Sequence, residues 1–336
     1  MFFGQWMFHR NRGEYKLALA LAEQMEKFGE ARNDVRVQLT GRYASGFIRF
    51  NLGDFVAARG LLERCHGLAD PAYRGGEVPS VLYPTYAVML AYLALILAIL
   101  GYIDQARSRL EEALSEARQL RHALRNAEVL FVASTVDFFT GSHEMQRHAE
   151  EVLALSTEHG FPAFFAWATV SRGVSLTALG QRQEGLSQIT RGITGLRAIG
   201  VGAGMSAALM LLAWAYARLG QPVDGLNCLA EAAQIIETTD ERRLEATLHL
   251  VRGELLDATG DPSAAEPSYY QAIAVAKLQS AKLFELRASI SLARLWCKQN
   301  RRGEARDLLA PIYDWFTEGF DTLDLKQAKA LLDELT

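Results

Sequence analysis

The sequence predicts an all-α fold, a right-handed α-α superhelix (solenoid) of about eight helical hairpins with a C-terminal capping helix. Three observations predict it. Glycines recur about every forty residues, small residues stand at fixed distances on both sides of them, and the apolar residues in between follow helical spacing. Proline fills only 8 of the 336 positions, which also favours long helices.

The glycine repeat indicates where the hairpins turn. Its intervals are 40, 48, 40, 39, 40, 40 and 40 residues, although only 27 of the 336 residues are glycine. The turns are predicted near Gly13, Gly53, Gly101, Gly141, Gly180, Gly220, Gly260 and Asn300. Asparagine fits the series because, after glycine, it most readily adopts the left-handed conformation that ends a helix.

Small residues on both sides of each turn predict that two antiparallel helices cross closely there. From the second turn onward, Gly, Ala or Ser stands seven positions before the turn residue, as at Gly46 and Ala293. Five positions after the turn residue the chain again has Gly or Ala, with Gln146 as the exception. Each unit of the repeat is therefore predicted to be a helical hairpin.

The segments between the turns have the pattern of amphipathic helices. After Gly101, for example, Ile103, Ala106 and Leu110 form an apolar stripe with charged residues on the opposite face. The one interval of 48 residues contains a stretch rich in glycine and proline at 70–80, which is predicted to be a loop insertion. No other linker interrupts the repeat, so residues 1–336 are expected to form one solenoid.

One segment, from Val81 to Ile103, contains no charged residue and is long enough to span a bilayer. Pro84 shortens its strongly apolar part to about fifteen residues, which is short for a membrane span and normal for a helix buried on all sides. Ala94 and Gly101 also keep the register of the repeat. We interpret the segment as the inner helix of the third hairpin and expect no membrane association.

The C-terminal stretch 313–325 is dense in aromatic and acidic residues. The repeat places its first part on the last hairpin and Gly319 at the end of that helix. Asp321 or Thr322 can then cap a closing helix predicted at about 322–335. We interpret the stretch as the end of the solenoid and not as a functional site.

Composition restricts the classes of function. A net charge of −4 and a pI of about 6.0 give no general attraction to nucleic acid. The three cysteines are far apart and lack metal-type spacing, which suits a reducing cytoplasm, and the N-terminus has no signal-peptide pattern. A cytoplasmic protein is predicted, with no nucleic-acid partner.

Motifs that carry chemistry are absent from the sequence. It contains neither G-x-x-x-x-G-K-[ST] nor G-x-S-x-G, and the glycine-rich stretch 200–204 is predicted to be a connector. His143 and His148 are expected on the surface, without a third metal ligand. We expect no deep cavity that would desolvate a carboxylate such as Glu254. No catalytic, cofactor-binding or metal-binding residue is predicted, and no cofactor.

The hairpin pattern resembles the tetratricopeptide repeat, in a long variant of about forty residues where 34 are typical. The stretches "GFPAFFAWATVSRGVSLTALGQRQEGLSQITRGI" and "ELRASISLARLWCKQNRRGEARDLLAPIYDWF" are similar to the C-terminal repeat region of bacterial STAND-type ATPases linked to adenylate/guanylate cyclases or to transcriptional regulators. The resemblance implies a non-catalytic sensor or interaction module, and a fragment of a longer signalling protein whose nucleotide chemistry lies upstream.

The register of that family places a set of aromatic and charged residues on the concave wall, which the first helix of each hairpin lines. Rings and charges arranged in this way suit a protein, a peptide or a small effector. The alternative for each ring is the ordinary core between helices. The candidate groove residues are Tyr43, Phe47, Phe50, Phe131, Phe138, Trp167, Trp214, Arg218, Glu254, Asp257, Arg287 and Arg294.

Two other functions stay open at this point. A scaffold could self-associate through an exposed N-terminal edge of Phe2, Phe3 and Trp6. An enzyme of the α-helical toroid kind would need an acidic metal motif such as D-D-x-x-D, and the nearest candidate is Asp321 with Asp324.

Overall fold

The computed structural model describes residues 2–68, 86–120 and 122–336, so the predicted loop insertion at 70–80 lies outside the described residues. The described residues form 17 α-helices and no strand, which confirms the predicted all-α fold. In the N-terminal half the helices are α1 (Phe2–Asn11), α2 (Tyr15–Ala31), α3 (Val35–Asn51), α4 (Phe55–Leu68), α6 (Tyr86–Leu100), α7 (Ile103–Gln119), α8 (Ala123–Thr140), α9 (Met145–His159) and α10 (Pro162–Ala178). In the C-terminal half they are α11 (Arg182–Ala198), α12 (Met205–Leu219), α13 (Pro222–Thr239), α14 (Glu245–Ala258), α15 (Pro262–Leu278), α16 (Lys282–Lys298), α17 (Arg302–Trp315) and α18 (Leu323–Leu335).

Consecutive helices pair as hairpins, from α1 with α2 to α16 with α17, and α18 packs against both α16 and α17. The residues that the sequence marks as turns lie between the two helices of each hairpin in the left-handed region, for example Gly101 with φ 95° and Asn300 with φ 61°. At Gly101 this conformation is one that side-chain-bearing residues rarely adopt, which explains the regular glycine.

From α9 to α16, left-handed residues also join one hairpin to the next. Gly160, Gly200, Asp240 and Ser280 have φ of 70°, 72°, 59° and 56°. They are forty residues apart. In this part of the chain the backbone therefore reverses at a fixed position at both ends of the hairpin, although two of these four connecting residues are not glycine.

Helix α6 accounts for residues 86–100 of the long uncharged segment, whose first residues, 81–85, lie outside the described residues. All fifteen of its residues are buried, because α4, α7, α8 and α16 surround it. In the part of the chain that the structure describes, no helix is long and apolar enough to cross a membrane. The apolar composition of α6 follows from its position inside the solenoid.

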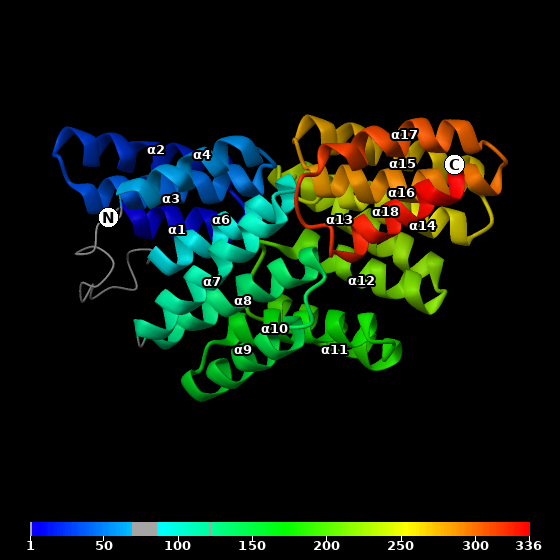
Figure 1. The fold of residues 1–336 in the computed structure, drawn as a ribbon. Helices are drawn as coiled ribbons and strands as arrows, with labels where there is room; N and C mark the ends of the chain where they lie inside the picture. Colours follow the sequence, from blue (N-terminus) through cyan, green and yellow to red (C-terminus); the bar gives the residue numbers. More distant parts are fainter. Residues whose placement is uncertain (1, 69–85, 121) are drawn as a thin grey trace.

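The solenoid bends back on itself, so that its N-terminal hairpins reach hairpins much later in the sequence (Figure 1). Lys16 Nζ lies 2.7 Å from Asp240 Oδ2. The backbone N–H of Arg243 donates to the carbonyl of Asn51 at 3.1 Å, and that of Ala203 donates to Asn11 at 3.3 Å. These contacts close one side of the superhelix over its concave wall.

A second closing contact joins the start of α7 to the segment after α17. The Glu318 carboxylate accepts the backbone N–H groups of Asp104 and Gln105 at 3.1 and 3.3 Å. The Asp104 carboxylate in turn accepts the N–H of Gly319 at 3.3 Å, and Arg107 pairs with Asp321 at 2.8 Å. Glu318 and Asp104 thus each accept backbone N–H groups of the other segment. The acidic stretch that ends the solenoid therefore docks on the third hairpin.

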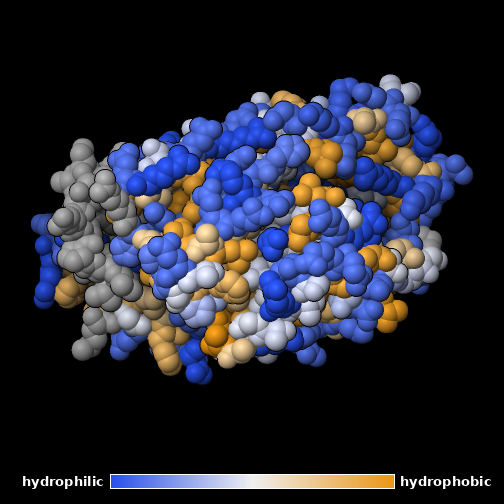
Figure 2. All heavy atoms as spheres, turned by 90° about the horizontal axis from the view of Figure 1, so that it is seen from below, coloured by the Kyte–Doolittle hydropathy of each residue, from blue (hydrophilic) through white to orange (hydrophobic). Residues whose placement is uncertain are grey.

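The surface is mixed. Seen from below, hydrophobic residues appear in separate patches among hydrophilic ones (Figure 2).

The buried apolar residues form three clusters along the chain, and Phe138 and Leu244 pack against both the first and the second. These two side chains lie where the superhelix closes.

Candidate functional site

A cavity of about 190 Å³ lies inside the superhelix, where the N-terminal helices meet the helices α12 and α14. Its wall comes from the first helices of successive hairpins, α3, α6, α8, α10, α12 and α14, and its rim from α1, α2 and the residues before α12 and α14. Single repeat positions recur in the wall, and residues six before the turn line the cavity in four hairpins. They are Phe47, Leu95, Thr135 and Trp214.

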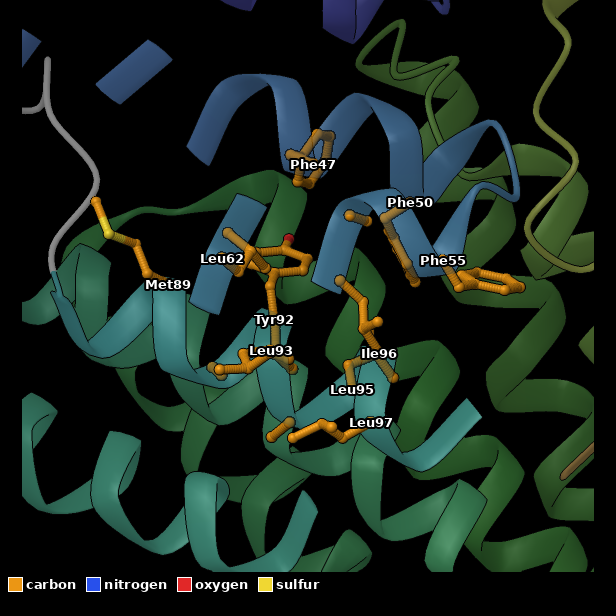
Figure 3. Packing of buried hydrophobic residues seen from close by; sticks show 14 of the residues in the cluster. Phe47, Phe50, Phe55, Leu62, Met89, Tyr92, Leu93, Leu95, Ile96 and Leu97 are labelled. Carbon is orange, nitrogen blue, oxygen red and sulfur yellow. The ribbon is translucent and has the colours of Figure 1, made fainter. Parts of the chain in front are cut away.

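Among the described residues, nine of the 25 that line the cavity are aromatic. Tyr92 of α6 points toward α3, where its ring centroid is 5.1 Å from that of Phe47 and 6.2 Å from that of Phe50 (Figure 3). On the opposite side Phe138 meets Trp214 edge to face at 6.1 Å. Such edge contacts are favourable geometries for rings and hold the wall in shape.

Six of the twelve predicted groove residues line this cavity: Phe47, Phe50, Phe131, Phe138, Trp167 and Trp214. Tyr43 does not. It is buried between Trp6, Phe47 and Tyr92, as an ordinary core ring. For Tyr43, core packing is thus the better interpretation.

The five charged candidates lie beyond the cavity, on α12, α14 and α16, and their partners are other residues of α12, α16 and α18. Arg287 binds Asp324 at 2.8 Å, and Asp257 binds Lys298 at 2.7 Å. Arg294 donates to Gln327 at 3.1 Å, and Arg218 stacks over the Trp214 ring at 5.3 Å. The structure brings these residues to one region, but most of them already have a partner within the fold.

Glu254 has a raised pKa because of desolvation, in spite of the nearby Arg218, Arg287 and Arg294. Its side chain is partly buried and does not line the cavity. No carboxylate of the described residues lines the cavity.

A histidine also differs from the prediction. His148 is buried, not on the surface, and its Nδ1 lies 2.7 Å from the carboxylate of the buried Asp137. Its other ring nitrogen, Nε2, lies 3.1 Å from Arg147. Both ring nitrogens thus have partners within the fold, on α8 and α9.

The cavity residues that sequence reasoning missed include Arg10, Tyr15, Tyr92 and Arg243. The repeat could have indicated Tyr92, because it is an aromatic residue on the first helix of the third hairpin. That helix lies in the uncharged segment, which was interpreted only with regard to membrane association. Arg10 and Arg243 have no such signal, because they reach the cavity only through the closure of the superhelix.

Arg243 is held by a buried acid. Its guanidinium lies 3.1 Å from the Glu241 carboxylate, which also accepts the N–H of Gly204 at 3.2 Å. Burial raises the pKa of Glu241, and the pairing with Arg243 opposes this only in part. The pair fixes the connector before α12 to the connector before α14, at the rim of the cavity.

The acidic candidates of the alternative enzyme lie outside the cavity, where Asp321 pairs with Arg107 and Asp324 with Arg287. Among the described residues no group of three or more His, Cys, Asp or Glu side chains could hold a metal ion. The N-terminal edge differs from its prediction at Trp6, which is fully buried, whereas Phe2 is exposed.

Comparisons with known proteins agree on the fold. The family model described as Tetratricopeptide repeat matches residues 206–234, in the α12–α13 hairpin. No curated protein matches the sequence significantly. Among solved structures, a Rap protein complexed with Competence and Sporulation Factor has a TM-score of 0.61 at 13% identity, over 99% of this chain and 95% of that chain.

Two further structures are similar. NprR in complex with its cognate peptide NprX gives a TM-score of 0.57 at 13% identity, over 88% of this chain and 82% of the other. The apo form of RapI gives 0.53 at 11% identity, over 88% and 99%. At these identities the likeness establishes a solenoid of the tetratricopeptide type.

Proposed function

We propose that the chain is a non-catalytic sensor module that binds a peptide or small effector in its central cavity. The observation that carries the proposal is the convergence of six successive first helices on one aromatic-lined cavity. Concave, mainly apolar sites with a few polar groups are the usual form of ligand sites. The similar fold of NprR in complex with its cognate peptide supports a peptide as one class of ligand.

We further propose that the module works in the cytoplasm of bacteria and passes ligand occupancy to a linked ATPase or nucleotide cyclase. The support is the resemblance of its repeats to the C-terminal region of STAND-type ATPases. Gene context tests this coupling. An ATPase or cyclase reading frame directly upstream in the same direction agrees with it, and an unrelated neighbourhood counts against it.

Filling the cavity should abolish ligand binding. Thr135 lines the cavity on α8, so Thr135→Trp would place a ring inside it. A library of short synthetic peptides and a metabolite extract are each incubated with the purified chain, and retained compounds are identified by mass spectrometry after gel filtration. Compounds retained by the wild type should be lost from the variant and recovered chemically unchanged.

The matched control is Thr157→Trp. Thr157 is also a helical threonine whose hydroxyl donates to the carbonyl four residues earlier, but it is exposed on α9. Its variant should retain the same compounds as the wild type. Equal retention by Thr135→Trp would place the binding elsewhere and reject the cavity as the site.

Self-association is a second candidate function, because large apolar side chains are exposed at the N-terminal end. Phe8 is 58% exposed, Leu17 56% and Phe28 40%. If these side chains join two copies, light scattering should give a mass that rises with concentration and returns to the monomer in Phe8→Ser/Phe28→Ser. A monomer mass at all concentrations would argue against the scaffold. Deleting residues 1–12 is a poorer test, because it would remove the buried Trp6.

A further inference from the structure

The charge around the cavity is unbalanced. Among the described residues that line it, two are arginines, Arg10 and Arg243, and none is Asp or Glu. The positive charge of Arg243 is compensated by Glu241, whose carboxylate lies 3.1 Å from the Arg243 guanidinium. Arg10 therefore contributes a positive charge that no acid among these lining residues compensates.

The Arg10 guanidinium lies against two aromatic rings. Its guanidinium carbon lies 4.4 Å from the Phe47 ring centroid and 5.3 Å from that of Trp6. Its Nε is buried without a hydrogen-bond partner, and the described residues offer it no ion pair. A buried donor without a partner is costly, and a guanidinium can donate two parallel hydrogen bonds to a carboxylate.

The size and walls of the cavity restrict the rest of the ligand. About 190 Å³ is less than the 300–1,000 Å³ typical of sites for larger ligands, so the bound body is small. Aromatic walls from Phe47, Phe138 and Trp214 favour an apolar, flat body. A group with two negative charges would leave one charge uncompensated among these rings, so a monoanion fits better.

We propose that the cavity binds a small apolar carboxylic acid, with its body between the aromatic walls and its carboxylate paired with Arg10. This inference rests on the proposed function, since it names the ligand class of the same site. It makes Arg10 the residue that selects for a charged ligand over a neutral one of the same shape.

Two matched probes test the inference, 2-naphthylacetate and 2-naphthylethanol, which share a ring system and differ in the charged head group. Calorimetric titration of the full chain should show that the acid binds more tightly than the alcohol. Arg10→Met keeps the apolar stem of the side chain and removes its charge, so it should weaken binding of the acid by about 10-fold or more. The alcohol should bind this variant as it binds the wild type.

Two variants serve as controls. Arg10→Lys keeps a positive charge and should retain most of the selectivity for the acid. Arg12→Met removes an exposed charge outside the cavity and should change neither affinity. Together they separate loss of charge at the cavity from loss of fold.

The outcomes distinguish this inference from the proposed function. If both probes bind equally and Thr135→Trp blocks both, the proposed preference for an acid is wrong, whereas the cavity remains a binding site. Binding of the acid that Arg10→Met does not weaken would also overturn it. If neither probe binds the wild type, the inference fails, and the library experiment decides the proposed function by itself.

Discussion

Replacing Phe316 by alanine should lower the free energy of unfolding by ~3–5 kcal/mol, the usual cost of removing a buried aromatic ring. Phe316 follows the last residue of α17, is only 4% exposed and belongs to the C-terminal hydrophobic cluster. It also lies against the turn at Gly101. The loss should therefore appear in urea unfolding followed by circular dichroism, and as faster hydrogen exchange in both α17 and the start of α7.

Phe320 provides the matched control, because it is the same residue type four positions later and is 47% exposed. Phe320→Ala should change the free energy of unfolding by no more than about 0.5 kcal/mol, as surface substitutions usually do. Similar losses in the two variants would mean that the docked segment, and not the buried ring, carries the stability.

Both variants test a feature that the sequence does not predict. Local signals, a glycine and residues that favour a helix start, suffice to interpret the aromatic and acidic stretch 313–325 as the end of the solenoid, although Thr322 at the N-cap of α18 makes no side-chain cap hydrogen bond. Its docking on α7, however, joins Glu318 to Asp104 and Asp321 to Arg107. Such pairs are far apart in the sequence and follow no repeat, so periodicity cannot reveal them.

The hairpins themselves could be predicted because one end of each needs a left-handed residue, which glycine and asparagine supply at low cost. The connections between hairpins need the same conformation, but Asp240 and Ser280 adopt it without being glycine. This second register, which the structure shows from Gly160 to Ser280, was therefore hidden, although it repeats every forty residues there.

The candidate site also has a part that the repeat indicates and a part that it does not. The repeat position six before the turn predicts a wall residue, and Phe47 and Trp214 were found because they are aromatic. Leu95 and Thr135 occupy that position too, but their residue types attract no attention. Arg10 and Arg243 belong to no common position and enter the cavity only because the superhelix closes. The charged part of the site could thus not be predicted from the repeat.

The closure itself is tested most directly at Gly101, where Gly101→Ala should lower the free energy of unfolding by ~2–5 kcal/mol. Two effects add. Left-handed backbone, here with φ 95°, costs a side-chain-bearing residue ~1–2 kcal/mol. The new Cβ would also lie 2.7 Å from the Trp315 ring and 3.0 Å from Lys282 Cβ, and such overpacking typically costs ~1–3 kcal/mol. Urea unfolding of the full chain measures the sum.

Gly141 separates the two effects, because it occupies the same position of the next hairpin with φ 70°. A Cβ added at Gly141 would have open space around it, with no neighbouring atom of the described residues within 4 Å. Gly141→Ala should therefore show only the backbone cost of ~1–2 kcal/mol. The difference between the two variants, ~1–3 kcal/mol, is the cost of crowding where the third hairpin meets the end of α17. Equal losses at the two glycines would show that this turn is free in solution, and that the superhelix is open there.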